Sequence, residues 1–218
     1  MKIKWYGHAA FLITSDQETK IMIDPYEPNA LGGQLSYGEI KDHVDIVLTS
    51  HDHADHNYTK DLPGTPQILK GGGSRTAKGI PIKGISTYHD PSKGSERGGN
   101  TIFKLKVDDI QLCHLGDLGH LLSDKELVEI GPVEILLIPV GGFFTINSEE
   151  AARVAEQIKP KILIPMHFKT AKCTFPIAPV EDFLKGKANI KRPKVSEVRF
   201  EKETLPDQME IVVLEHAL

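Results

Sequence analysis

The sequence is poor in the features that mark secreted, membrane-spanning and nucleic-acid-binding proteins. Its 2 cysteines among 218 residues, Cys113 and Cys173, are too few for a disulfide framework. No apolar run approaches the roughly 20 residues that cross a bilayer. The chain is slightly acidic, with 26 Lys and Arg against 30 Asp and Glu, whereas affinity for a nucleic-acid backbone needs a basic surface. The first residues, Met1 to Trp5, lack the apolar centre of a signal peptide. We therefore expect a cytoplasmic protein with no membrane segment and no nucleic-acid partner.

What remains is the composition of one folded domain. Apolar residues make up 39% of the chain and charged residues 26%, as in ordinary globular proteins. No linker or repeat divides the sequence, so we expect a single domain over residues 1–218. The stretches 25–43 and 90–100 are long for plain connections, and one or both are expected to shape a site.

The order of secondary structure favours sheets covered by helices. Short β-prone segments in the first half predict strands at 2–6, 10–14, 20–23, 44–49, 80–87, 101–107 and 110–114. In the second half, the pairs Ser123 with Glu126 and Asn147 with Glu150 predict capped helix starts. A shorter helix is predicted at 179–184, and strands are predicted at 135–140, 162–165, 195–200 and 209–214.

The densest chemical signal lies between Ser50 and Asn57. The segment reads Ser-His-Asp-His-Ala-Asp-His-Asn and follows an apolar strand directly. On an extended chain, His51 and His53 send their rings the same way, and Asp55 with His56 can turn back from the following loop. Imidazole and carboxylate without thiolate favour Zn, Mn, Fe or Ni. The alternative, a polar loop with solvent-facing histidines, does not explain so dense a cluster.

Three further candidates stand where an apolar strand is predicted to end. His89, Asp117 and His167 each follow such a segment. A lone histidine is more often a surface or core residue than a ligand. The repeated arrangement nevertheless points to a common site, because loops at strand ends are where rigid scaffolds place functional groups.

Together these motifs resemble the metallo-β-lactamase superfamily. The resemblance runs from Asp24 to His167 and includes Trp5-Tyr6-Gly7-His8-Ala9 and His114-Leu115-Gly116-Asp117. Within the superfamily the chain is most similar to the small cytosolic hydrolases related to the ascorbate-6-phosphate lactonase branch. The resemblance implies an αββα sandwich, in which two mixed sheets face each other, helices lie outside, and metals sit at one edge of the sheets.

The resemblance also implies a ligand set. One metal would be held by His51, His53 and His89, and the second by Asp55, His56 and His167. Asp117 would bridge both metals. Asp24 would orient a ligand from behind. His114 competes with His89 for its place, but it lies inside the strand before Asp117 and is expected to act behind the ligands or in the structure. His8 and His120 are expected either to reach the site, as acid groups or behind the ligands, or to be buried structural histidines.

The expected chemistry is hydrolysis of a small molecule. Two divalent cations about 3.5–4 Å apart can hold a bridging hydroxide, which would attack a lactone, ester or phosphoester. Asp55 is predicted both to bind metal and to act catalytically, by orienting the hydroxide or carrying its proton. Arg97, Asn100 and Lys169 are candidates for binding an anionic substrate group, although all three also fit ordinary surface polarity.

Several alternatives stay open at this point. Zinc suits the ligands best, with manganese and iron as alternatives. A nuclease or an iron-dependent oxidoreductase of the same superfamily would use a similar site, and a non-catalytic metal-binding module would keep only part of it. The sequence gives no indication of substrate identity or oligomeric state.

Overall fold

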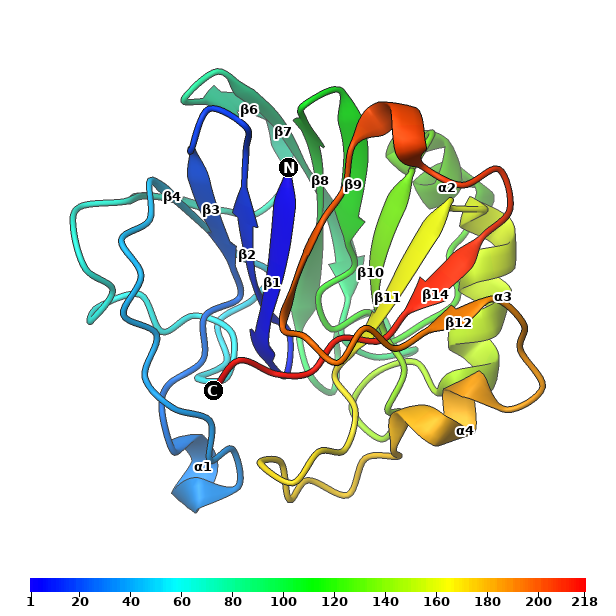
Figure 1. The fold of residues 1–218 in the computed structure, drawn as a ribbon. Coiled ribbons are helices and arrows are strands. Elements are labelled where there is room, and N and C mark those ends of the chain that lie inside the picture. The colour runs from blue at the N-terminus through cyan, green and yellow to red at the C-terminus, as the bar shows by residue number, and fades with distance from the viewer.

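The computed structural model describes all residues from 1 to 218 and contains two β-sheets packed face to face. In Figure 1 the sheets stand side by side, the N-terminal strands on the left and the later strands on the right. Both sheets are mixed, so the predicted sandwich of two mixed sheets is confirmed.

The first sheet has six strands in the order β13-β1-β2-β3-β4-β5. These are β1 (Lys2–Gly7), β2 (Ala10–Thr14), β3 (Lys20–Ile23), β4 (Ile46–Thr49), β5 (Gln67–Lys70) and β13 (Glu197–Arg199). Pairing is antiparallel from β13 to β3 and parallel from β3 to β5. Because β3 and β4 are parallel, the residues that follow them emerge at the same edge of the sheet.

The second sheet has eight strands in the order β12-β14-β11-β10-β9-β8-β7-β6. They are β6 (Gly73–Ala77), β7 (Ile80–Tyr88), β8 (Gly99–Val107), β9 (Ile110–His114), β10 (Ile135–Pro139), β11 (Ile162–Met166), β12 (Ile190–Lys191) and β14 (Glu210–Val212). The strands from β9 to β12 in this order are parallel, and β6 to β9 form an antiparallel meander.

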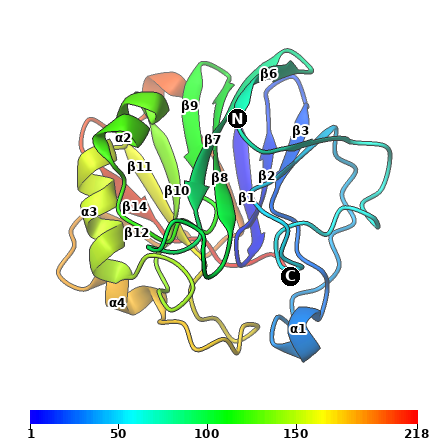
Figure 2. The same cartoon turned by 180° about the vertical axis from the view of Figure 1, so that it is seen from behind.

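Helices cover the outer face of the eight-stranded sheet, as seen from behind in Figure 2. They are α2 (Asp124–Ile130), α3 (Ser148–Ile158) and α4 (Val180–Leu184). The predicted capping boxes are present: the Ser123 side chain accepts from Glu126 N, and the Asn147 side chain accepts from Glu150 N. These reciprocal bonds satisfy backbone donors at the start of each helix.

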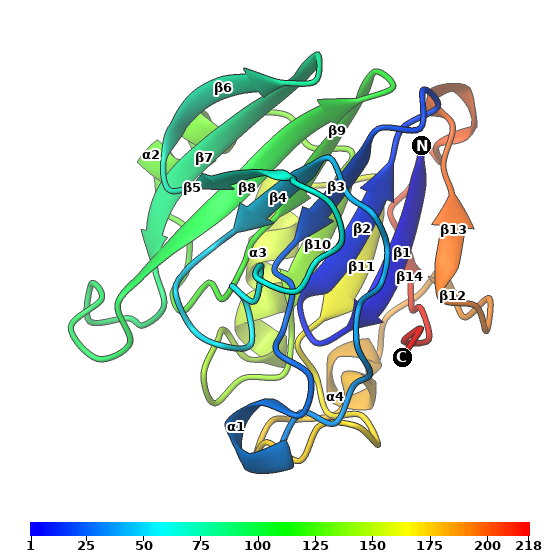
Figure 3. The same ribbon diagram turned by 90° about the vertical axis from the view of Figure 1, so that its left-hand side faces the viewer.

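The outer face of the six-stranded sheet is covered differently. Loops lie in front of this sheet in Figure 3, and the one assigned helix on this side, α1 (Ala30–Gly33), has two residues with non-helical dihedral angles. A second apolar cluster replaces a helix layer here, and it includes Met22, Tyr26, Tyr37 and Val47. The segment 25–43 is anchored to the sheet through the buried residues of this cluster, whereas residues 31–34 and several others along it are exposed.

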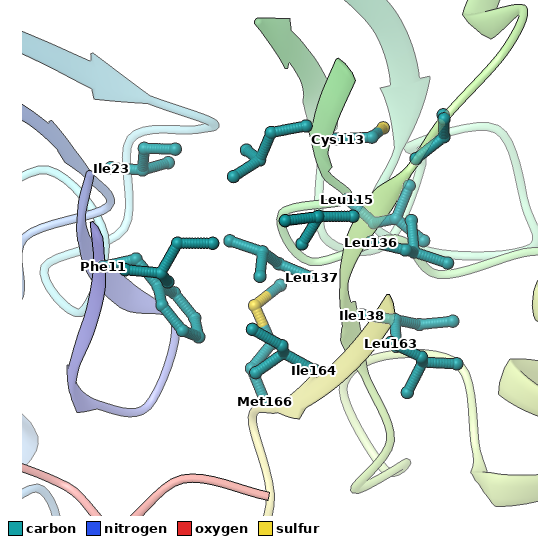
Figure 4. Packing of buried hydrophobic residues seen from close by; sticks show 14 of the residues in the cluster. Phe11, Ile23, Cys113, Leu115, Leu136, Leu137, Ile138, Leu163, Ile164 and Met166 are labelled. Atoms are coloured by element: carbon teal, nitrogen blue, oxygen red, sulfur yellow. The ribbon is translucent and has the colours of Figure 1, made fainter. Parts of the chain in front are cut away.

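The main core fills the space between the sheets. Figure 4 shows Phe11 and Ile23 from the six-stranded sheet facing Leu137, Ile164 and Met166 from the other. Strands β10 and β11 are buried at every position, as expected for parallel strands covered on both faces. The core therefore fixes the two sheets relative to each other and, with them, the loops at their shared edge.

The sequence-based strands and helices are largely confirmed, with residues 10–14, 20–23 and 110–114 matching the observed strands in full. Strands β5, β6 and β12 were not predicted. Most of their residues are exposed, so they lack the buried alternation by which a strand is recognised. No helix in the structure is both long enough and apolar enough to span a bilayer.

Candidate metal centre

The predicted ligands come together at one edge of the sandwich. His51, His53, Asp55 and His56 follow β4 of the six-stranded sheet. His89, Asp117 and His167 follow β7, β9 and β11 of the eight-stranded sheet. The site is thus built where two sheets meet, from loops that follow the buried strands β4, β9 and β11 and the partly exposed strand β7.

The donor atoms form three overlapping groups, each with all its atoms within 4.8 Å of one another: His51, His53 and His89; His8, Asp55, His56 and His167; and His51, His56 and Asp117. The first group is the set that the family resemblance implied for one metal. The second group contains the implied set for the other metal and adds His8. Asp117 lies between them, its Oδ2 being 3.2 Å from Nε2 of both His56 and His89 and 3.3 Å from that of His167.

The ligand histidines after β4 are oriented from behind by Asp24. Its buried carboxylate accepts from Ser50 N at 2.7 Å, Ser50 Oγ at 2.6 Å and His56 Nδ1 at 2.9 Å. Because Ser50 gives its hydroxyl proton to Asp24, it accepts from His51 Nδ1 at 2.9 Å. Both rings therefore carry a proton on Nδ1 and present Nε2 to the site, where a bound cation would take the place of any second proton.

The residues present suit divalent cations. Six buried side-chain atoms of the cluster have no hydrogen-bond partner: His8 Nδ1, His51 Nε2, His56 Nε2, His89 Nδ1, Asp117 Oδ1 and His167 Nδ1. Buried polar atoms without partners are costly. Imidazole nitrogens and carboxylate oxygens are the ligands expected for zinc, manganese or iron. Cations would satisfy those that share one donor group, namely His51 Nε2, His56 Nε2 and Asp117 Oδ1.

Burial and mutual charge set the protonation of the cluster. Burial lowers the pKa of His51 to about 3 and that of His8 to about 4. Burial would also lower the pKa of His56, but Asp117 and Asp55 outweigh it and raise this pKa well above 6.5. Conversely, burial would raise the pKa of Asp117, but His167 and His56 hold it well below its usual value. The carboxylates are thus ionised at neutral pH, as metal ligands must be.

His8 reaches the metal centre. It is fully buried in the turn between β1 and β2, and its Nε2 is 3.1 Å from Asp55 Oδ2. Its ring centroid is 4.1 Å from that of His167, and its carbonyl oxygen accepts from Trp5 Nε1 and His167 N. His8 therefore fixes Asp55 on one side and the chain after β11 on the other.

Asp117 is held by a neighbouring strand. Asn100 in β8 accepts from Asp117 N with Oδ1 at 3.0 Å and donates from Nδ2 to Leu115 O and Thr87 Oγ1. The Gly116 and Gly119 backbones pass so close to their neighbours that an added Cβ would lie 2.3 Å from Asn100 Oδ1 and 2.2 Å from the His89 carbonyl carbon, respectively. Asn100 therefore shapes the Asp117 loop, and its role as a candidate for binding substrate stays a prediction.

Three other candidates lie apart from the cluster. His114 donates from Nε2 to Ala9 O at 2.9 Å and accepts from Gly116 N with Nδ1 at 3.0 Å, so neither nitrogen is free to bind metal. His120 bonds Leu121 O and Tyr88 N. Lys169 donates to Phe175 O and borders a hollow beside Trp5 and Val180 instead of the metal cluster.

A cleft of about 520 Å³ opens onto the cluster. Its lining includes His53, Asp55, His89, Asp117 and His167 and, beyond them, Leu31, Gln34, Arg97, Phe144 and Phe175. Arg97 is thus the one predicted substrate-binding residue that borders this cleft. The size suits a small molecule.

Two residues of the site were missed in the sequence. Ser50 stands directly before His51, but only its position between Asp24 and His51 reveals its role. Asp90, directly after His89, is fully buried and accepts from four backbone N–H groups of the following loop. No motif in the sequence marks either contact.

Comparisons with known proteins identify the superfamily of this fold. The family model described as "Beta-lactamase superfamily domain" matches residues 2–167. A UPF0173 metal-dependent hydrolase from Pyrococcus abyssi is 31% identical over 196 residues, covering 78% of this chain and 85% of the relative. A relative of the same description from Carboxydothermus hydrogenoformans is 32% identical over 196 residues, with the same coverage. A crystal structure from Thermotoga maritima, described as a candidate Zn-dependent hydrolase of the metallo-β-lactamase superfamily, superimposes with a TM-score of 0.82 at 34% identity and covers 98% of both chains.

The chain therefore belongs to the metallo-β-lactamase superfamily, as the sequence motifs predicted. Like these relatives, it is a hydrolase of that superfamily.

Proposed function

We propose that this protein is a dinuclear metal-dependent hydrolase of small molecules. One observation carries the proposal: two groups of donors lie side by side, and Asp117 lies between them. His51, His53 and His89 would hold one cation, and Asp55, His56 and His167 the other. We propose zinc as the metal, with manganese and iron as the alternatives that these ligands also suit.

Bound divalent cations would lower the pKa of a water molecule toward neutrality and polarise the bond to be broken. The chain's own residues do the rest. Asp24 and Ser50 keep two imidazoles in the tautomer that presents Nε2, and Asp117 neutralises positive charge in the centre. Asp55 borders the cleft and has one carboxylate oxygen, Oδ2, held by His8. These contacts support the proposal that Asp55 orients the attacking water and receives its proton.

The substrate class that fits is a lactone, ester or phosphoester small enough for the cleft of about 520 Å³. A cytoplasmic location completes the proposal, and it is supported by two buried cysteines that are both free, which suits a reducing compartment.

The test is elemental analysis of purified protein, followed by a hydrolysis screen of lactones, esters and phosphoesters. We expect close to two zinc or manganese ions per chain and metal-dependent turnover. Asp55→Ala should lose turnover, whereas His43→Ala, an exposed histidine outside the metal groups, should match the parent protein. One metal or none after reconstitution would contradict the dinuclear centre. Iron with oxidase activity, or salt-sensitive cleavage of RNA, would favour the other chemistries of the superfamily.

A further inference from the structure

We propose that Arg97 recognises an anionic group of the substrate, so that the enzyme acts on anionic molecules with an apolar portion. This inference rests on the proposed hydrolase function and deepens it. Arg97 is the only lysine or arginine among the residues that line the cleft. It stands at the rim, because it also borders the neighbouring hollow that contains Lys70.

The Arg97 guanidinium is available to a ligand. Its side chain is 32% exposed, and its one ionic partner is the exposed Glu96, at 3.6 Å. Glu96 is itself engaged, since its other carboxylate oxygen accepts from Ser92 Oγ at 2.7 Å. A neighbouring-residue ion pair of this kind contributes little when exposed to water. An arriving carboxylate or phosphate could therefore replace it with paired N–H···O bonds.

The backbone of Arg97 is firmly held in place. The Asp90 carboxylate accepts from the backbone N–H groups of Ser92, Gly94, Glu96 and Arg97, at 2.8, 2.9, 3.1 and 2.8 Å. The loop closes where His89 N donates to Gly98 O at 3.0 Å. The same short loop thus fixes both the predicted ligand His89 and Arg97. A binding group held in advance loses less conformational entropy when a ligand arrives.

An aromatic wall joins Arg97 to the metal cluster. The guanidinium carbon is 6.0 Å from the centroid of the Phe144 ring, and that centroid is 5.5 Å from the centroid of Phe175. The Phe175 centroid is in turn 5.7 Å from the centroid of the His8 ring. Leu31, 50% exposed, borders the same cleft. A substrate that bridges Arg97 and the cluster would therefore lay an apolar portion against these rings.

Other charges of the cleft do not cancel this preference. Asp52 borders the cleft, but Lys70 Nζ pairs with its Oδ1 at 2.6 Å. Asp55 and Asp117 face the metal groups, where bound cations would compensate them. Arg97 thus supplies the positive charge at the outer end of the cleft.

The experiment is calorimetric titration of the metal-loaded protein with three probes of similar size: phenylphosphate, phenylacetate and the neutral phenylacetamide. We expect an anionic probe to bind more tightly than phenylacetamide. Arg97→Met should weaken anion binding roughly 10- to 100-fold and leave phenylacetamide binding unchanged. Arg97→Lys should retain part of the affinity. Arg75→Met, a half-buried arginine of β6 outside this cleft, is the matched control and should bind all three probes as the parent protein does.

The possible results distinguish a failure of this inference from a failure of the proposed hydrolase function. A preference for phenylphosphate over phenylacetate would assign the anion as a phosphate, and the reverse a carboxylate. If Arg97→Met retains its metal but binds anions as well as the parent protein, the inference is wrong and the hydrolase stands. Absence of anion binding by the metal-loaded parent protein also overturns the inference. Absence of metal binding would instead remove the proposed function itself.

Discussion

In the proposed two-metal centre, replacing Asp24 with asparagine should weaken the cation site at His56 and spare the other. In the parent protein, the carboxylate accepts three bonds: one from the fixed backbone donor Ser50 N and two on Oδ2, from Ser50 Oγ and His56 Nδ1. An amide has a single acceptor oxygen. That oxygen must stay on Ser50 N, because the backbone donor cannot rotate away. The amide NH₂ group then faces Ser50 Oγ and His56.

The two imidazoles respond differently to this change. Ser50 Oγ can turn to accept from the amide and still accept from His51 Nδ1. His56 has no such freedom, so its Nδ1 must accept and its proton moves to Nε2, the atom that faces the cluster. We therefore expect loss of about 1.4–2.7 kcal/mol of binding free energy for the cation held by His56, which is the 10- to 100-fold typical of changes behind a metal ligand.

The assay is competition with a chromogenic chelator, which resolves two affinities, together with metal content per chain. Asp45→Asn is the matched control, because Asp45 also accepts from a backbone N–H, that of Lys20 at 2.9 Å, and stands at the start of β4, at the end away from the cluster. We expect one weakened and one unchanged affinity for Asp24→Asn and two unchanged affinities for Asp45→Asn. Equal weakening of both sites, or none in a folded variant, would refute the tautomer argument.

Two further predictions concern the frame of the site. Burial lowers the pKa of His114 below 6.5, so the folded state binds fewer protons than the unfolded state just below that pH. Its stabilising contribution is complete above pH 6.5 and is lost as the pH falls toward the folded pKa, with a slope of at most about 1.4 kcal/mol per pH unit. Urea unfolding of metal-free protein between pH 8 and 5 should therefore show a shallower dependence for His114→Gln, and parallel curves would contradict this. Gly119→Ala places a Cβ 2.2 Å from the His89 carbonyl carbon, whereas Gly99→Ala meets nothing closer than 3.9 Å. Thermal unfolding should show a large loss of stability for the first and little for the second, and a native melting temperature with full metal content for Gly119→Ala would refute the close approach.

Local patterns predicted the elements that local interactions determine. The strands before the cluster are buried apolar runs of strand length, and the capping boxes lie within four residues of sequence. The segment from His51 to His56 was recognisable because its donors are neighbours in the chain. The edge strands β5 and β6 are mostly exposed and have no buried face, so no pattern of apolar residues marked them in the sequence.

Contacts between distant segments were beyond such reasoning. From the sequence, Asn100 is a candidate for binding substrate through its amide group. Only the pairing of β8 with β9 brings it within hydrogen-bond distance of Asp117 N. In the sequence, Asp90 is indistinguishable from any other aspartate in a loop. Only the structure shows that four backbone N–H groups donate to its carboxylate. His8 joins the cluster because the turn between β1 and β2 packs against the chain after β11. Each of these roles arises from the tertiary fold.

The origin of the ligands in both sheets has a consequence for how the protein matures. His8 and His167 lie far apart in the 218-residue chain, yet their ring centroids are 4.1 Å apart. The donors meet only when the two sheets pack together, so cations that prefer this set would bind the assembled sandwich and shift the folding equilibrium toward it by mass action. Such cations would also tie one sheet to the other without a covalent bond.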